Sequence, residues 1–174
     1  MKKYQIIYAD PPWKYDFHRE LKNRPSRKQI VETHYPTMTL DEIKNINIPS
    51  EKNSVLFLWV TSPKLKEGME VLCDWGFNYV TSIIWDKLSM MMGYWLRSQH
   101  EIVLIGRKGK FSPPRLQKSS IVKAKRRGHS KKPDEMRSII EEMFPDASRI
   151  ELFAREKTEG WDVWGNEVES DIEF

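Results

Sequence analysis

Short apolar runs alternate with amphipathic segments along the chain. The first run, Tyr4 to Ala9, is rich in strand-favouring residues and stops at Asp10-Pro11-Pro12, because proline cannot continue a central strand. Ser54 to Val60 is almost continuously apolar, which is typical of a strand covered on both faces. Further strands are expected over three ranges: Phe77 to Trp85, Glu101 to Gly106 and Ser148 to Ala154.

The segments between these runs have helical periodicity. Thr39, with Glu42 three residues later, forms a capping-box pattern at the start of a helix. Pro63 to Trp75 predicts a second helix that ends at Gly76, and a third begins near Pro133. The alternation of helices and apolar strands predicts an α/β fold with a mostly parallel sheet. With 174 residues, we expect one domain spanning 1–174.

Composition supports a folded, soluble protein. Hydrophobic residues make up 39% of the chain, with seven Trp, six Tyr and seven Phe, which excludes disorder for most of it. Cys73 is the single cysteine, so no internal disulfide can form, and its apolar helix predicts a core position. No apolar run approaches the roughly 20 residues that cross a bilayer, and the N-terminus lacks a signal-peptide pattern. We therefore expect a cytoplasmic protein.

The net charge of +4 conceals an uneven distribution. Arg107 to Lys132 contains eleven Lys or Arg and no Asp or Glu, whereas the rest of the chain has 18 basic against 25 acidic residues. Its Ser-Pro-Pro and Lys-Ser-Ser sequences predict a loop, and a solvated surface loop is the simpler interpretation. Together with a basic loop at 14–34, the segment could instead bind nucleic acid. The candidate contacts are Lys123, Lys125, Arg126 and Arg127.

The strongest candidate for a catalytic motif is Asp10-Pro11-Pro12-Trp13. It follows a predicted buried strand, so it would lie at the carboxyl edge of the sheet, where α/β proteins bind ligands. An ordinary turn, with Trp13 in the core, is the alternative. The exocyclic amine of a base is a poor nucleophile because its lone pair is delocalised. The Asp10 carboxylate and the Pro11 carbonyl could accept its two N–H groups and direct the lone pair at a methyl donor. Trp13 could stack on the base.

Ordered motifs span nearly the whole chain: Ala9-Asp10-Pro11-Pro12-Trp13, His34-Tyr35-Pro36-Thr37-Met38, Leu56-Phe57-Leu58-Trp59-Val60-Thr61, Ile83-Ile84-Trp85, Tyr94-Trp95-Leu96, Ser130-Lys131-Lys132-Pro133-Asp134-Glu135, Ile150-Glu151-Leu152-Phe153-Ala154-Arg155 and Trp164-Gly165-Asn166-Glu167. Together they resemble the adenine-N6 methyltransferases named after the seventy-kilodalton catalytic subunit of the mRNA methyltransferase, the MT-A family.

The resemblance implies a Rossmann-like methyltransferase fold with permuted order, the catalytic motif preceding the cofactor motif. It also implies S-adenosylmethionine as cofactor and the N6 amine of adenine as target, which we expect in DNA and in a prokaryotic or phage setting. Asp10 would lie where amine and cofactor meet, with Pro11, Pro12 and Trp13 shaping the base pocket. Tyr35 and Trp95 match aromatic positions beside that pocket.

The same resemblance implies a set of cofactor contacts. Lys132 matches a residue that binds the cofactor's carboxylate, although it could be one more surface lysine. Glu151 is placed to accept hydrogen bonds from ribose hydroxyls, as a strand-end carboxylate does in nucleotide-binding sheets, or to pair with Arg149. The remaining positions are Phe153, which could also be core, Arg155 and Asn166. The chain departs from the family by lacking a His-Asn pair after Arg155 and by carrying Glu167 in place of an amide.

Two other functions remain open at this point. The target adenosine could be in RNA, or the chain could be a non-catalytic nucleic-acid-binding subunit, against which the intact Asp10 to Trp13 motif argues. Metal or covalent chemistry is not indicated, because the four His and Cys73 show no ligand spacing and no phosphate-binding Gly-rich loop is present. No separate target-recognition module is evident in the sequence, so a second copy of the chain, in a homodimer, could supply further contacts to the substrate.

Overall fold

The computed structural model describes residues 2–15, 36–93, 95–128 and 131–173. Tyr35 and nearly all of the 14–34 basic loop lie outside the described residues. Along the chain the elements are β1 (Tyr4–Ala9), α1 (Leu40–Lys44), β2 (Ser50–Val60), the 3-10 helix η2 (Ser62–Lys64), α2 (Leu65–Asp74), β3 (Asn78–Asp86), β4 (His100–Lys108), β5 (Ile121–Lys123), α3 (Asp134–Met143), β6 (Arg149–Leu152) and β7 (Asp162–Trp164).

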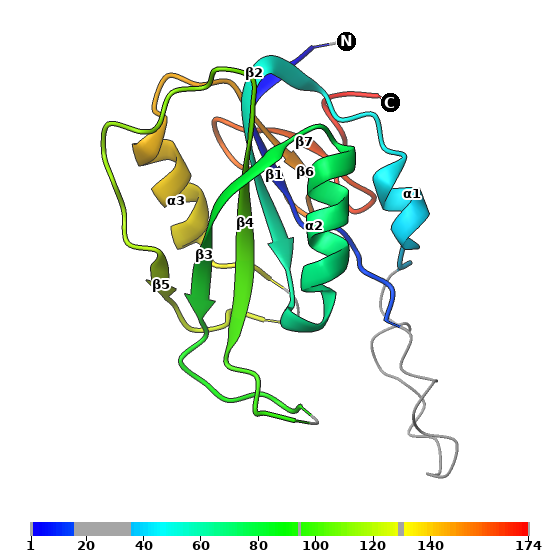
Figure 1. Ribbon diagram of the computed structural model, residues 1–174, viewed down its shortest axis with the longest axis vertical. Helices are drawn as coiled ribbons and strands as arrows, with labels where there is room; N and C mark the ends of the chain where they lie inside the picture. The colour runs from blue at the N-terminus through cyan, green and yellow to red at the C-terminus, as the bar shows by residue number, and fades with distance from the viewer. Residues whose placement is uncertain (1, 16–35, 94, 129–130, 174) are drawn as a thin grey trace.

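One sheet organises the molecule (Figure 1), with strand order β5-β3-β4-β2-β1-β6-β7. β1 pairs in parallel with β2 and β6, β6 with β7, and β3 with β5. β4 lies antiparallel to both β2 and β3, so within the described residues it alone runs against the other strands. The expected Rossmann-like α/β architecture is confirmed, and the carboxyl ends of β1 and β3 share one edge of the sheet.

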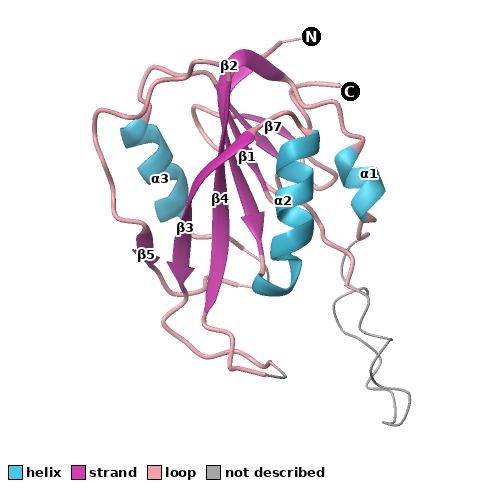
Figure 2. Cartoon of the chain, in the orientation of Figure 1, coloured by secondary structure: helices cyan, strands magenta, loops and turns pink. Residues whose placement is uncertain are grey.

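Helices cover both faces of the sheet (Figure 2). Successive residues of β2 point to opposite sides, so Leu56 and Leu58 join the core with α1 and α2, whereas Phe57 joins the core with α3. The second core includes Met136 and Ile140 of α3. Burial on both faces explains why the central strands are almost continuously apolar in sequence.

Most predicted elements are confirmed within a few residues. β1 has the expected bounds, and the capping box of α1 is present: the Glu42 backbone N–H donates to Thr39 Oγ1, while the Thr39 N–H donates to the Glu42 carboxylate. Gly76 ends α2 in the left-handed region, with φ 81°. The sequence did not predict β5 and β7, each three residues long, and β5 lies inside the basic segment expected to be a loop.

The core position expected for Cys73 is wrong. Its side chain is exposed, although Leu72 and Val71 beside it are fully buried. Each residue turns about 100° around a helix, so the position after Leu72 faces away from the sheet. Membership of an apolar helix was therefore not enough to predict that Cys73 is buried.

Candidate active site

The Asp10–Trp13 loop leaves the end of β1 and is tied to the sheet and to Met38. The Asp10 N–H lies 3.4 Å from the Leu152 carbonyl, and the Met38 N–H donates to the Pro12 carbonyl at 2.9 Å. The Pro11 carbonyl accepts the Trp13 N–H at 2.9 Å. A carbonyl oxygen has two lone pairs, so Pro11 keeps one acceptor position for a ligand.

Trp13 is a core residue in this structure. The residue is 7% exposed, and its indole N–H donates to the Trp59 carbonyl at 3.1 Å. A base needs an open ring face to stack on, so the expected stacking role does not fit this position of the ring, and the core alternative holds. Trp13 therefore supports the loop from within the protein.

Asp10 begins a chain of four alternating charges. Lys132 Nζ lies 2.9 Å from Asp10 and 3.1 Å from Glu101, and Lys87 Nζ lies 2.7 Å from Glu101. Every one of these side chains is at most 22% exposed. Burial makes charged groups costly unless they are paired, and here each charge has an opposite neighbour. The interpretation of Lys132 as one more surface lysine is wrong.

The network sets the protonation states around the catalytic loop. Burial alone would lower the pKa of Lys132, but Asp10 and Glu101 outweigh it and hold that pKa above its ordinary value. Burial raises the pKa of Asp10 above its usual range, with Lys132 opposing the rise and Glu101 adding to it. For Glu101 the burial effect is overcome by Lys132 and Lys87, which lower its pKa.

Glu151 belongs to a second buried ion pair. Its two carboxylate oxygens accept hydrogen bonds from Arg137, one from Nε at 2.8 Å and one from Nη2 at 3.0 Å. Burial raises the pKa of Glu151, and Arg137 opposes that rise. Arg149, the partner considered from the sequence, donates instead to the Phe144 and Pro145 carbonyls. β6, which carries Glu151, lies inside the sheet between β1 and β7.

Two buried aromatic residues connect the two ion networks. The rings of Tyr8 and Trp59 meet edge to face, with centroids 6.3 Å apart. Lys132 Nζ lies 5.1 Å from the Trp59 ring, and the Arg137 guanidinium lies 5.9 Å from the Tyr8 ring. Tyr8 Oη and Trp59 Nε1 are buried without a hydrogen-bond partner among the described residues. Buried polar atoms are normally paired, so this position suits a polar ligand or an ordered water.

The other predicted cofactor positions follow β6. Phe153 adopts the left-handed region with φ 63°, a strained conformation for a non-glycine residue that costs about 1 to 3 kcal/mol and is frequent at functional sites. Its ring packs on Trp164 at 5.4 Å, and it is partly buried against the core. Arg155 Nε lies 3.6 Å from Glu167, and Asn166 is exposed. The residue that replaces a family amide, Glu167, is thus an ion-pair partner.

The predicted substrate-binding residues lie on two separate segments. Trp95, which the resemblance places beside the base pocket, is 97% exposed in the β3–β4 connection. Lys123, Lys125 and Arg126 are exposed and make no ion pair with any described residue. Arg127 differs, because it pairs with Asp134 and Glu135 at the start of α3. Of the four predicted contacts, one is therefore neutralised by its neighbours, while three have no ion pair with a described residue.

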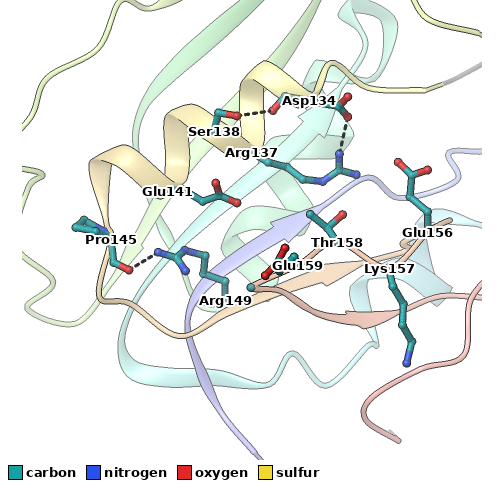
Figure 3. A pocket seen from close by; sticks show the side chains of 11 residues that line it. Asp134, Arg137, Ser138, Glu141, Pro145, Arg149, Glu156, Lys157, Thr158 and Glu159 are labelled. Atoms are coloured by element: carbon teal, nitrogen blue, oxygen red, sulfur yellow. Dashed lines mark hydrogen bonds and ion pairs between the residues drawn. The ribbon is translucent and has the colours of Figure 1, made fainter.

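A cavity of about 810 Å³ opens beside the second ion pair. It lies between α3 and the loop after β6, and Arg137 reaches from the helix toward the loop that carries Glu156 and Thr158 (Figure 3). Arg137 thus contacts Glu151 on one side and lines this cavity on the other.

The sequence reasoning missed four residues of the site: Tyr8, Lys87, Glu101 and Arg137. Lys87 and Glu101 flank the ends of two apolar runs, which is the signal that could have marked them as edge residues. Recognising them also required the direction of β4, because an antiparallel strand brings its first residue, not its last, to the catalytic edge. Arg137 interrupts the apolar face of α3, which is a second available signal.

Comparison with known proteins identifies the family. The MT-A70 family profile matches residues 4–167, nearly the entire chain. The chain belongs to the MT-A70 family. Among its relatives is the type II methyltransferase M.MunI of Mycoplasma sp, which is 36% identical over 96% of this chain and 78% of its own length. The MT-A70-like N(6)-adenosine-methyltransferase of Arabidopsis thaliana is 35% identical, and the human N(6)-adenosine-methyltransferase catalytic subunit METTL3 is 34% identical.

The match covers different shares of these relatives. This MT-A70 chain spans 23% of the Arabidopsis protein and 28% of the human one, against 78% of the Mycoplasma protein. The MT-A70 chain is a methyltransferase, and its methyl donor is S-adenosylmethionine. The site suits that molecule: Lys132 offers a cation for a carboxylate, Asp10 and Glu151 offer anions, and the unpartnered Tyr8 and Trp59 atoms offer polar contacts.

Proposed function

We propose that this chain transfers a methyl group from S-adenosylmethionine to the N6 amine of adenine in DNA. The observation that carries the proposal is the Asp10–Lys132–Glu101–Lys87 network, which holds an acceptor carboxylate at the carboxyl edge of an MT-A70 fold. The DNA substrate is supported by the type II methyltransferase, of which the chain covers 78%. The adenosine methyltransferases have about three quarters of their length outside the match.

The chemistry assigned to the loop follows from its acceptors. Asp10 and the free lone pair of the Pro11 carbonyl accept hydrogen bonds from the two amine N–H groups, so the nitrogen lone pair is directed outward. S-adenosylmethionine, when bound, supplies a methyl group on a positively charged sulfur. With the donor bound, an N–C bond would form on the amine as the S–C bond breaks and S-adenosylhomocysteine leaves, and Asp10 would take the surplus proton of the amine and pass it to solvent. The prolines keep the loop stiff and add no competing donor.

We assign the cofactor to the residues around the two ion pairs. Lys132 would bind its carboxylate, and Glu151, oriented by Arg137, would accept ribose hydroxyls. Phe153, Arg155 and Asn166 follow β6 and complete the proposed set. The lysine has two carboxylate partners in the described structure, so cofactor binding must compete with them.

RNA adenosine is the second candidate substrate, because two of the relatives are named N(6)-adenosine-methyltransferases and are 34% to 35% identical. The deciding experiment incubates the purified chain with isotopically labelled S-adenosylmethionine and parallel pools of single-stranded DNA, duplex DNA and RNA. Nucleoside mass spectrometry then reads the product. We expect N6-methyldeoxyadenosine; methylation confined to RNA, or to no nucleic acid, would refute the DNA proposal.

The pH profile tests the charge network. In Glu101→Gln, Asp10 loses a neighbouring negative charge and Lys132 loses its competing partner, so the pKa of Asp10 falls. Asp10 must be ionised to accept the amine, so the acidic limb of the kcat profile should move to lower pH. Lys132→Met should move it to higher pH. Both are measured at saturating cofactor, with the surface variant Glu70→Gln as control; shifts in the same direction for both would contradict the network.

The basic segment should govern salt-dependent binding. Neutralising Lys123, Lys125 and Arg126 together should weaken duplex DNA binding and reduce the slope of log K against log salt by about 2 to 3, because each phosphate contact contributes about 0.9. Fluorescence anisotropy across a salt series measures this. The control exchanges three exposed lysines elsewhere, Lys3, Lys52 and Lys66, which should leave the slope unchanged. Equal slopes for both triple variants would show that the basic segment is a solvated surface loop that does not bind DNA.

Three broader expectations belong to this proposal. We propose that residues 1–174 form one methyltransferase domain, and limited proteolysis tests this. We also propose that two copies of the chain bind the DNA as a homodimer, and sedimentation with and without DNA tests this. None of the helices in the part of the chain that the structure describes is long and apolar enough to cross a membrane. We also place the protein in the cytoplasm, which cell fractionation tests.

A further inference from the structure

We propose that the tip of the β3–β4 connection is a wedge that enters duplex DNA beside the adenine being methylated. The inference rests on the proposed function and adds to it the part that opens the duplex. The tip carries four apolar side chains with unusually high exposure: Met90 at 72%, Met92 at 78%, Trp95 at 97% and Leu96 at 83%. Soluble proteins rarely expose such a group without a binding partner.

The tip projects from the edge that carries the catalytic loop. β3 and β1 point the same way in the sheet, so the connection leaves from the same edge as Asp10, and Figure 1 shows it extending beyond the sheet. β3 lies three strand positions from β1, or about 14 Å. A flipped base leaves the stack, so a side chain that fills the stack must stand apart from the flipped base, which the spacing of these two strands allows.

The connection is built to hold its tip in place. Its stem is closed by the Lys87 N–H donating to the Gln99 carbonyl at 2.9 Å and the Met91 N–H donating to the Ser98 carbonyl at 2.7 Å. Asp86 Oδ1 accepts the Leu88 N–H and the Gln99 side chain, both at 2.9 Å. Lys87 then ties this stem to Glu101, and through Lys132 to Asp10. The tip is therefore positioned relative to the catalytic carboxylate.

The turn at the tip is too tight for a side chain at its glycine. A Cβ atom at Gly93 would lie 2.1 Å from the Leu96 carbonyl oxygen, so the backbone closes on itself there. Trp95 and Leu96 occupy this closed turn and point into solvent. Leucine and methionine are among the apolar side chains that proteins insert between base steps, and tryptophan can stack on bases.

The charges around the tip select DNA as its partner. From Lys87 to His100 the chain has no Asp or Glu, and Arg97 Nη1 lies 3.5 Å from the Met92 sulfur. Arg126, from the basic segment, reaches the Met91 sulfur at 3.1 Å. An apolar tip with two arginines bonded to its methionines matches a base stack that is bordered by phosphates. Cations beside inserted apolar side chains are typical of proteins that bind and kink DNA.

The test compares Trp95→Ala,Leu96→Ala with the wild type on three substrates: a paired duplex, the same duplex with the target adenine opposite an abasic site, and the single strand. A wedge is needed only where the base must leave an intact pair. Methylation of the paired duplex, relative to the abasic duplex, should therefore fall about tenfold to a hundredfold, the range of one lost stacking contact. Val80→Ala, which alters an exposed apolar residue of β3, is the control and should leave the ratio unchanged.

Base flipping is measured separately with 2-aminopurine at the target position in duplexes with randomised flanks. Fluorescence should rise with the wild type and with Val80→Ala, and should not rise with the double variant. This fluorescence readout does not depend on methyl transfer. If the wild-type protein flips the base but methylates no DNA, the proposed function is refuted while the wedge is still supported. Equal losses on all three substrates, or no loss, would overturn the wedge. So would a wild-type dimer that the double variant dissociates, because the tip would then be a self-association surface.

Discussion

Asp10→Asn should lower methyl transfer by about 10²- to 10³-fold or more while the protein stays folded. The Asp10 carboxylate is the stronger of the two proposed acceptors. The side-chain amide of asparagine can instead turn its own N–H group toward the amine N–H of the base, and the two donors repel each other. Losses of this size are typical when one preorganised electrostatic contact is removed from an active site. The measurement is single-turnover transfer of labelled methyl at saturating cofactor, so that binding and chemistry are separated.

The control for this variant is Asp146→Asn, which makes the same exchange at an exposed position without an ion pair to any described residue. Asp10→Asn should retain the circular dichroism spectrum of the wild type, and its cofactor affinity can be measured by calorimetry. A variant that binds cofactor, stays folded and keeps most of its turnover would remove Asp10 from the chemistry. Such a result would point to the Pro11 carbonyl as the sufficient acceptor.

Arg137→Met should destabilise the protein by about 3 to 5 kcal/mol. The change leaves the Glu151 carboxylate buried without the bidentate partner that lies 2.8 and 3.0 Å away, and an unpaired buried charge is costly. Arg137→Met,Glu151→Leu should recover most of that loss, because the charge and its partner are removed together. Urea unfolding gives the free energy of each variant, and the two single changes with the double one form a thermodynamic cycle.

The same cycle separates stability from function. The double variant should fold well yet bind S-adenosylmethionine weakly, because no carboxylate remains for the ribose. The control is Arg127→Met, which breaks an exposed pair at the start of α3 and should cost no more than about 1 kcal/mol. A double variant with wild-type cofactor affinity would show that Glu151 is structural. Equal destabilisation by Arg127→Met and Arg137→Met would show that burial of the second pair contributes little.

The two ion networks also explain why the site was only half visible in the sequence. Asp10 and Lys132 each lie in a motif, and each motif can be recognised from its neighbours along the chain. Glu101 and Lys87 lie in no motif, and they join Asp10 only because β4 runs antiparallel beside β3. The connection between these strands is thirteen residues, Lys87 to Gln99, a length that permits either a hairpin or a crossover to a parallel strand. Sequence spacing therefore could not decide the direction of β4.

Glu151 illustrates the same limit. A strand-end carboxylate is an expected partner for ribose, and the nearest cation in sequence, Arg149, was the obvious competitor. In the structure Arg149 is occupied by two backbone carbonyls, and the buried partner comes from α3 fourteen residues earlier. Cys73 was predicted in the core and is exposed, whereas Trp13, for which both a base contact and a core position were considered, is buried. Residue type alone does not fix burial when the helix or loop can turn either way.

By itself, the sequence determined the positions of the long strands and helices, the catalytic loop after β1 and the likeness to one methyltransferase family. These features depend on neighbouring residues: apolar periodicity, proline and glycine at element ends, and a capping box. Only the tertiary structure decided which distant charges share the site, which cations of the basic segment are neutralised and where the apolar tip points. Those outcomes depend on strand order and direction, which arise from packing across the whole sheet and leave no local mark in the chain.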